Sequence, residues 1–114
     1  MTERVIGVIP ARYESSRLPG KPLLEIHGKP MIYWVAMRVA QSTLDDYLVA
    51  TDDKRIMATC ENYNIPCLLT SIDCRNGTER VAETTKKIKA DYYINVQGDE
   101  PLINVRAINQ VRLY

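Results

Sequence analysis

The chain has 114 residues, of which 46% are hydrophobic and 25% are charged, and its 15 Lys and Arg nearly balance its 14 Asp and Glu to give a net charge of +1. A chain of this length buries roughly 65% of its unfolded surface on folding, so these figures predict one globular domain and exclude intrinsic disorder as the main interpretation. The near-zero charge argues against a general nucleic-acid binder, because phosphate-driven binding needs many uncompensated cations.

Neither membrane insertion nor secretion is indicated. The apolar run at residues 5–9 ends at Pro10, far short of the about 20 residues that span a bilayer, and it lacks the pattern of a signal peptide. Cys60, Cys67 and Cys74 are an odd number of widely spaced cysteines, unlike a zinc site or a disulfide framework. We therefore expect a cytoplasmic protein whose cysteines are packing residues.

The first predicted strand covers residues 4–10, a continuous apolar run rich in β-branched residues. Such runs are typical of strands that are buried on both faces. The next segment, residues 11–22, can continue neither a helix nor a central strand, because it contains Pro19, Gly20 and Pro22. It is predicted to be a loop.

A short strand at 23–26 and a turn come next, followed by a helix from Pro30 to Gln41, since proline is favoured at the first helical position. The apolar content of this helix is supplied by Met31, Trp34, Val35, Met37 and Val39. A second strand is predicted at 47–50. It is followed by Thr51, Asp52 and Asp53, which we expect to cap a helix over 56–63.

The same alternation continues to the end of the chain. Strands are predicted at 66–69 and 92–96, with a helix over 78–89 between them, a polar corner at 97–101 and a further helix over 104–114. Strands that alternate with helices predict an α/β fold around a mostly parallel sheet. No repeat or linker divides residues 1–114, so we treat them as part of one domain.

Four polar loops follow the predicted strands. In parallel α/β sheets, ligands bind in the crevice beyond the carboxyl ends of the strands, so these loops are expected to share one site. They are residues 11–22, 51–53, 70–77 and 97–101.

The first loop has the chemistry of a polyphosphate site. Arg12, Arg17 and Lys21 fall close together with Glu14 among them; arginine offers planar bidentate contacts to phosphate and lysine a point charge. The loop is neither a Walker A loop, because Pro22 follows Gly20-Lys21, nor a dinucleotide-binding loop, because it lacks the three spaced glycines. A solvated basic loop is the alternative for any one of these cations taken alone.

Four motifs, in order and at fitting spacing, resemble one family of enzymes. They are Pro10-Ala-Arg-Tyr-Glu-Ser-Ser-Arg-Leu-Pro-Gly-Lys-Pro22 followed by Gly28-Lys-Pro-Met31, then Ala50-Thr-Asp-Asp53, Asn76-Gly-Thr-Glu-Arg80 and Asn95-Val-Gln-Gly-Asp-Glu-Pro-Leu102. Together they resemble the 3-deoxy-manno-octulosonate cytidylyltransferases. The resemblance implies a Rossmann-like three-layer sandwich of the nucleotide-diphospho-sugar transferase type. It also implies that residues 1–114 are the nucleotide-binding N-terminal part of the domain, with the C-terminal half absent.

The activity that this resemblance implies is transfer of CMP from CTP to 3-deoxy-D-manno-octulosonate (Kdo), giving CMP-Kdo and pyrophosphate for lipopolysaccharide biosynthesis. Mg²⁺ is the implied cofactor, and the implied partners are CTP and the acid sugar, with a homodimer in the full-length form. No nucleic acid or membrane partner is expected. Two alternatives stay open: a non-catalytic CTP-binding fragment, and a spore-coat-type cytidylyltransferase acting on another sugar.

The resemblance also implies roles for individual residues. Arg12 and Lys21 correspond to catalytic cations on the triphosphate, Asp99 to a catalytic Mg²⁺ ligand, and Gln97 to a sugar contact. The implied nucleotide-binding residues are Pro10, Ala11, Arg12, Arg17, Lys21, Thr70, Ser71, Asn76, Gly77, Thr78 and Arg80. Two of them have simpler interpretations, because Arg80 could pair with Glu83 at i+3 on a helix face and Thr78 could be only a helix cap.

Overall fold

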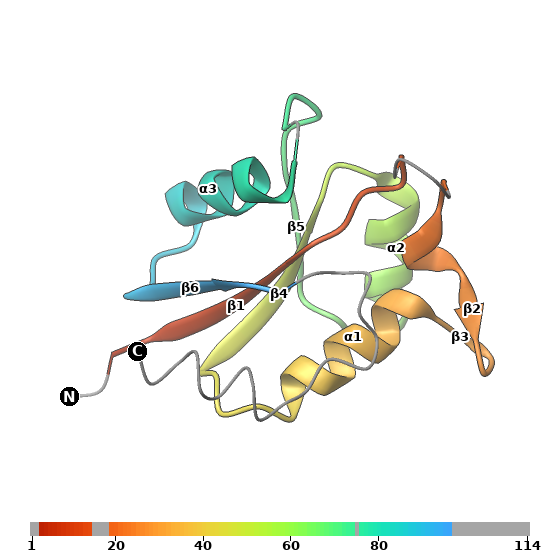
Figure 1. The fold of residues 1–114 in the computed structure, drawn as a ribbon, viewed down its shortest axis with the longest axis horizontal. Coiled ribbons are helices and arrows are strands. Elements are labelled where there is room, and N and C mark those ends of the chain that lie inside the picture. Colours follow the sequence, from red (N-terminus) through yellow and green to blue (C-terminus); the bar gives the residue numbers. More distant parts are fainter. Residues whose placement is uncertain (1–2, 15–18, 75, 97–114) are drawn as a thin grey trace.

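A computed structural model of the protein describes residues 3–14, 19–74 and 76–96. Its main sheet has four parallel strands in the order β5-β4-β1-β6 (Figure 1). They are β1 (Val5–Pro10), β4 (Asp46–Thr51), β5 (Cys67–Leu69) and β6 (Tyr92–Asn95). The predicted α/β fold with a parallel sheet is confirmed.

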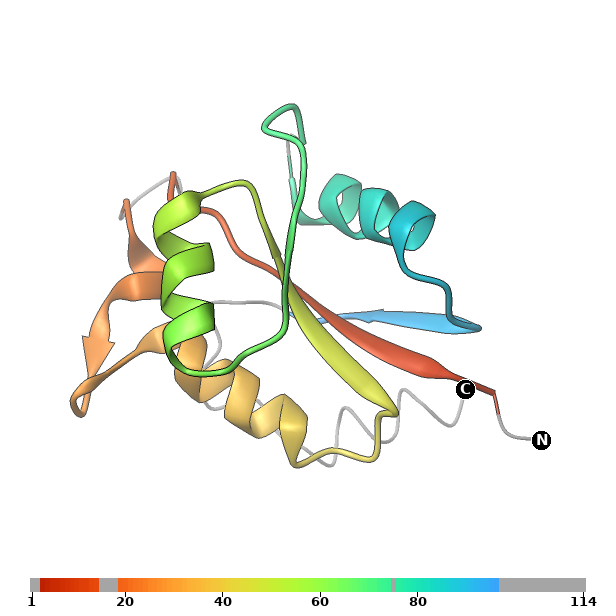
Figure 2. The same ribbon diagram turned by 180° about the vertical axis from the view of Figure 1, so that it is seen from behind.

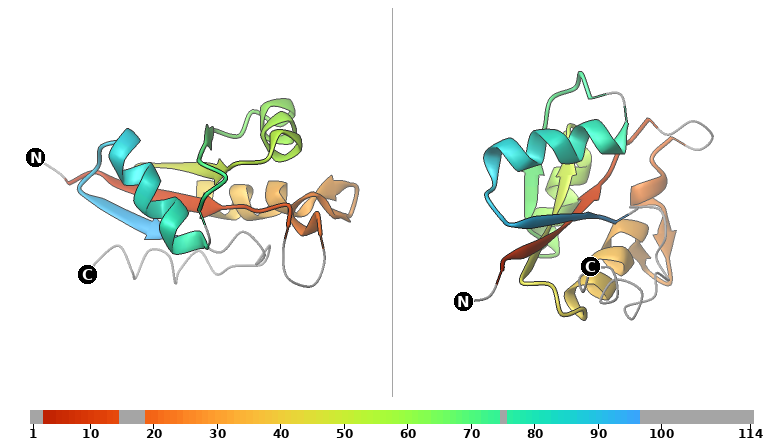
Figure 3. Two further views of the ribbon diagram at one scale, coloured as in Figure 1. Left: turned by 90° about the horizontal axis from the view of Figure 1, so that it is seen from above. Right: turned by 60° about the vertical axis from the view of Figure 1, so that its left-hand side comes forward.

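The order of the strands determines which face of the sheet each helix covers. From β1 the chain moves outward to β4 and β5, and it then returns to the other side of β1 to form β6. Because parallel crossovers are right-handed, this reversal puts the last helix on the opposite face from the first two. Figures 2 and 3 show the result, with α1 (Met31–Ala40) and α2 (Lys54–Asn62) on one face and α3 (Gly77–Lys87) on the other. The described part of the chain is thus a three-layer sandwich.

Each face of the sheet has its own hydrophobic core. Ile9 and Val49 point toward α1 and α2 and pack with Ile32, Val35 and other buried residues of those helices. The other face is smaller. Its buried residues are Ile6, Val8, Leu48 and Ala50, with Val81, Ile88 and Tyr93 packed against them.

A short hairpin lies between the first loop and α1. It consists of β2 (Glu25–Ile26) and β3 (Lys29–Pro30), joined by His27 and Gly28 with φ values of 50° and 83°. Two successive positive φ values define the type I′ turn that matches the twist of a hairpin. The indole of Trp34 in α1 donates a hydrogen bond of 2.8 Å to the carbonyl of Ile26, which attaches the hairpin to the helix.

Several boundaries differ from those predicted. The short 3₁₀ helix η1 (Lys21–Leu23) begins within the predicted loop and occupies the start of the predicted strand 23–26. Pro30 is the N-cap of α1 and the last residue of β3, rather than the first residue of the helix. α2 begins two residues before the predicted range and α3 one residue before it. The predicted helix over 104–114 and the polar corner at 97–101 lie outside the described residues.

Among the described helices, none is long and apolar enough to cross a membrane.

Candidate nucleotide site at the carboxyl edge of the sheet

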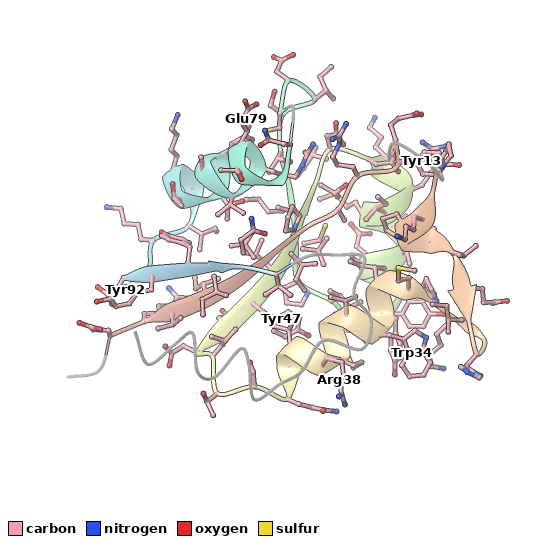
Figure 4. All side chains as sticks on the ribbon, viewed as in Figure 1. Tyr13, Trp34, Arg38, Tyr47, Glu79 and Tyr92 are labelled. Carbon is pink, nitrogen blue, oxygen red and sulfur yellow. The ribbon has the colours of Figure 1, made fainter. Side chains whose placement is uncertain are left out.

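Backbone hydrogen bonds hold the loops after β1, β4 and β5 together where they leave the sheet. The amide of Ala11 donates to the carbonyl of Ala50 at 2.9 Å, and the amide of Thr70 donates to the carbonyl of Thr51 at 2.8 Å. In Figure 4, Tyr13 and Glu79 mark this carboxyl edge, while Tyr92 lies at the opposite edge of the sheet. Three of the four predicted loops therefore meet, and the fourth lies outside the described residues.

A cavity of about 360 Å³ opens between these three loops. The post-β1 loop supplies one wall and the segment from β5 to α3 supplies the other. The lining residues are Arg12, Tyr13, Glu14, Asp52, Asp53, Ile72, Cys74 and Arg80. Arginines from both walls thus face a volume that also contains carboxylates.

Contacts with α2 hold the post-β1 wall in place. The guanidinium carbon of Arg55 lies 3.3 Å from the ring centroid of Tyr13, a cation–π contact. The carbonyl of Tyr13 accepts a hydrogen bond of 2.6 Å from the amide of Gly20, which closes the base of the loop. Gly20 has a φ of 76°, and a Cβ there would lie 3.0 Å from the Tyr13 ring, so this position favours glycine.

The two adjacent aspartates after β4 have different roles. Asp53 caps α2, since its Oδ1 accepts from the amides of Arg55 at 2.8 Å and Ile56 at 3.1 Å, and its carboxylate also pairs with the Arg55 guanidinium. The side-chain hydrogen bond from Arg55 lowers the pKa of Asp53, and it outweighs the opposing effect of burial. Asp52 instead lies 3.8 Å from Nη1 of Arg80. The capping role is confirmed for Asp53, and Asp52 belongs to the cavity.

Arg80 is a buried cation in the cavity wall. Its side chain is 1% exposed, and Nη1 donates a hydrogen bond of 2.5 Å to Oγ1 of Thr70, which is itself buried. Within the described residues, Nε of Arg80 has no hydrogen-bond partner. The surface-helix alternative, in which Arg80 pairs with Glu83, is wrong: Glu83 pairs with Lys87 at 3.2 Å, and Arg80 reaches across to Asp52.

The first turn of α3 is built by the Asn-Gly-Thr segment. Oδ1 of Asn76 accepts from the amide of Glu79 at 2.9 Å, so Asn76 is the N-cap and Thr78 is not. The start of α3 lies close to the end of β1, because a Cβ on Gly77 would lie only 3.2 Å from Cγ of Pro10. The helix N-terminus is thereby placed beside the cavity.

Cys74 is the thiol of the cavity wall. Its Sγ donates to Oε1 of Glu83 at 3.6 Å. Burial raises the pKa of Cys74, and the hydrogen bond to Glu83 adds to this, while Arg80 acts in the opposite direction. The thiol is therefore protonated at neutral pH, which argues against a nucleophilic role.

The structure places the predicted site residues in three groups. Arg12 and Arg80 line the cavity; Pro10, Ala11, Lys21, Thr70, Ser71, Asn76, Gly77 and Thr78 lie in or beside the loops that form it. Arg17, Gln97 and Asp99 lie outside the described residues. In the described ranges there is no cluster of three or more His, Cys, Asp or Glu side chains that could hold a metal ion, so these residues do not by themselves fit Mg²⁺.

Six of the lining residues were not among the predicted site residues. They are Tyr13, Glu14, Asp52, Asp53, Ile72 and Cys74. A signal existed for Asp52, because only one of two adjacent aspartates can be the N-cap and the other remains available at the edge of the sheet.

A parallel sheet whose helices cover both faces, with its cavity at the carboxyl edge, defines a Rossmann-like α/β protein of the nucleotide-binding class. The cytidylyltransferase sequence family matches residues 6–114, which is nearly the entire chain. The chain belongs to this cytidylyltransferase family.

The similar proteins include several 3-deoxy-manno-octulosonate cytidylyltransferases. The protein of that name from Vibrio campbellii is 53% identical over 107 residues, which are 91% of this chain and 42% of the relative. The one from Psychrobacter sp. is 49% identical over 109 residues, or 92% of this chain and 40% of the relative. The mitochondrial protein of Arabidopsis thaliana is 51% identical over 112 residues, which are 95% of this chain and 38% of the relative. The chain therefore spans about two fifths of the length of these relatives.

Solved structures agree with this assignment. A structure of CMP:2-keto-3-deoxy-manno-octonic acid synthetase complexed with CTP has a TM-score of 0.94 and 45% identity, covering 96% of this chain and 46% of that one. A cytidylyltransferase from Leptospira borgpetersenii has a TM-score of 0.84 at 23% identity, covering 99% of this chain and 49% of that one, and shows the shared fold alone. The nucleotide-diphospho-sugar transferase type of sandwich predicted for the chain is consistent with both.

Proposed function

We propose that the protein acts in the transfer of CMP from CTP to Kdo, giving CMP-Kdo and pyrophosphate for lipopolysaccharide biosynthesis. The observation that carries this proposal is the identity of 49–53% to 3-deoxy-manno-octulosonate cytidylyltransferases over more than nine tenths of the chain. The cavity supports it, because the match to the cytidylyltransferase family, residues 6–114, includes all three loops that form the cavity. In the proposed reaction a hydroxyl oxygen of Kdo bonds to the α-phosphorus of CTP, the bond from that phosphorus to pyrophosphate breaks, and the hydroxyl proton leaves.

The chain's own residues would bind and orient the nucleotide. Arg12 lines the cavity from the post-β1 loop, and Lys21 follows Gly20 at the base of the same loop. Cations at these positions would hold the phosphates and stabilise the charge that develops on them in the transition state. Arg80 would do so from the opposite wall.

Mg²⁺ is part of the proposal, with Asp99 as its ligand and Gln97 as a sugar contact. When bound, the ion would neutralise charge on the phosphate oxygens. Magnesium requires several oxygen ligands in near-octahedral array, and the described residues offer no cluster of that kind. The proposal also includes a homodimer in the full-length form. It further includes a cytoplasmic location, which is typical of a protein with free thiols such as Cys60.

A second candidate is a non-catalytic CTP-binding unit. The observation that favours it is the lining of the cavity, which offers Arg12 and Arg80 to a nucleotide, while the described residues hold no cluster of metal-binding side chains. Both candidates require CTP binding, and only the first requires turnover.

Release of pyrophosphate from CTP in the presence of Mg²⁺ and Kdo tests the proposal, with Asp99→Ala measured in parallel. Release that needs both Kdo and Asp99 is the expected result. Binding of CTP without release would favour the non-catalytic unit. Turnover with a different sugar, in a panel that includes other acid sugars and other nucleotides, would favour the spore-coat-type alternative instead.

A further inference from the structure

Side chains on one face of α3 form hydrogen bonds with the end of β5 and the segment that follows it. Arg80, Glu83 and Lys87 are spaced by three and four residues, so they lie on the same side of the helix. Arg80 donates to the side chain of Thr70 at 2.5 Å, and Nζ of Lys87 lies 3.3 Å from the carbonyl of Leu69. Both contacts reach backbone or side-chain groups at the end of β5.

Glu83 is the central residue of this face. Its Oε2 accepts from the amide of Ser71 at 2.8 Å and its Oε1 accepts from Sγ of Cys74 at 3.6 Å. Lys87 pairs with it at 3.2 Å, one turn further along α3. Burial opposes ionisation of Glu83, but the hydrogen bonds from Ser71 and Lys87 outweigh it and lower the pKa of the carboxyl group. The single carboxylate of Glu83 thus contacts both ends of the turn from Ser71 to Cys74.

The same turn is closed from within. Oγ of Ser71 accepts from the amide of Asp73 at 3.0 Å, and the carbonyl of Ser71 accepts from the amide of Cys74 at 3.4 Å. With its amide bonded to Glu83, Ser71 has a partner for each of its polar groups. Ile72 is 79% exposed in this turn and lines the cavity, as does Cys74.

The charges of the cavity indicate which part of a nucleotide would meet this turn. The turn contributes two uncharged residues to the cavity, Ile72 and Cys74, whereas the charged residues of the lining lie outside the turn: Arg12, Glu14, Asp52, Asp53 and Arg80. An exposed isoleucine offers apolar contact to the flat ring of a base, and phosphate groups gain nothing from such a contact. The turn is therefore the side of the cavity that fits the base.

We infer that Glu83 is a positioning residue that fixes the 71–74 turn in the shape against which the base of the nucleotide docks. This inference rests on the proposed function, because it requires that the cavity binds CTP. It assigns a role to a residue that does not itself line the cavity.

The test uses the full chain and the variants Glu83→Ala and Glu83→Gln, with Glu61→Ala on α2 as a control that removes an exposed carboxylate elsewhere. The first readout is hydrogen exchange of the Ser71 amide without any nucleotide. The second is the affinity for CTP, for UTP and for inorganic tripolyphosphate, which has the charge of the triphosphate without a base.

We expect Glu83→Ala to speed exchange of the Ser71 amide and to weaken CTP binding by about tenfold, as loss of a charge-assisted hydrogen bond implies. Its preference for CTP over UTP should shrink, while tripolyphosphate affinity stays within about twofold. Glu83→Gln retains an acceptor for the amide and should lie between wild type and Glu83→Ala. If Glu83→Ala does not fold, the same exchange and affinity measurements on Glu83→Gln test the inference.

Three results overturn the inference. One is unchanged exchange at Ser71 in both variants. Another is faster exchange with unchanged CTP affinity, which would make Glu83 a purely structural residue. The third is an equal loss of CTP and tripolyphosphate binding. If the wild-type chain does not bind CTP at all, both the proposed function and this inference fail. If the wild type binds CTP and Glu83→Ala binds it equally well, only the inference about Glu83 fails.

Discussion

Arg80 has a charge and almost no exposure to water. A buried guanidinium is costly unless it is paired and hydrogen-bonded. Here Thr70 provides a hydrogen bond, but the carboxylate of Asp52 is 3.8 Å away and 23% exposed. Such incomplete pairing beside a cavity is the arrangement expected of a cation that gains a further partner when an anionic ligand binds.

Replacement of Arg80 by methionine should therefore separate stability from binding. The unfolding free energy should fall by only about 1–2 kcal/mol, because water can hydrate the Asp52 carboxylate that is left. The affinity for CTP should fall by tenfold or more if a charge-assisted contact is lost. Urea denaturation and calorimetric titration measure the two effects.

Lys86→Met is the matched control, since Lys86 is an exposed cation on the same helix. It should leave both quantities close to wild type. An Arg80→Met protein that binds CTP as well as wild type would remove Arg80 from the nucleotide site.

At the scale of single elements, Asp53 is the N-cap of α2, and its carboxylate also pairs with Arg55, which lies over the Tyr13 ring. Replacing Asp53 by alanine should cost about 1 kcal/mol of unfolding free energy at neutral pH, because two amides at the helix N-terminus lose their acceptor.

The same variant has a distinct pH dependence. The pKa of Asp53 is lower in the folded state than its ordinary value of 3.8, so its contribution is fully present above that value and is lost as pH falls through the lower folded pKa. The stability difference between wild type and Asp53→Ala should therefore be constant above about pH 5 and shrink below pH 4. Acid titration of thermal unfolding checks this, with Asp73→Ala, an exposed aspartate, as the control. A difference that grows toward low pH would contradict the assignment.

The elements predicted best from sequence were those fixed by local composition. The strand predicted over 4–10 is confirmed as β1 at Val5–Pro10, because a β-branched apolar run can be buried on both faces of a parallel sheet. The boundaries of α1 were shifted because Pro30 also pairs with Glu25 in the hairpin. Ile32 and Ala36, missing from the predicted apolar face of α1, are fully buried, because both belong to the core that α1 and α2 form against the sheet.

The site was predicted only in part, for a physical reason. The cations near Arg12 were recognisable because they are close together in sequence. The contact between Asp52 and Arg80 joins the loop after β4 to helix α3, 28 positions further along the chain, and no local pattern predicts it. Helical spacing left open a pair between Arg80 and Glu83. That pair does not form, because tertiary contacts direct both side chains toward the segment after β5.

At the scale of the whole molecule, the loops that form the cavity are positioned by the sheet. The chain moves outward from β1 to β5 and then reverses to β6, and ligands of open α/β sheets bind at such a reversal. The cavity lies at the carboxyl edge beside it, with an arginine on each wall. This placement supports the proposal that the cavity binds a nucleotide.

The most direct test of this account is a titration of the ¹⁵N-labelled 114-residue chain with CTP, followed through its backbone amide NMR signals. We expect shifts at residues 11–14, 52–53 and 70–80 that saturate together, and smaller shifts with CMP at 11–14 than with CTP. Amides at the opposite edge of the sheet, such as that of Tyr92, should not move. Saturable shifts centred away from the three loops, or no shifts at millimolar CTP, would contradict it.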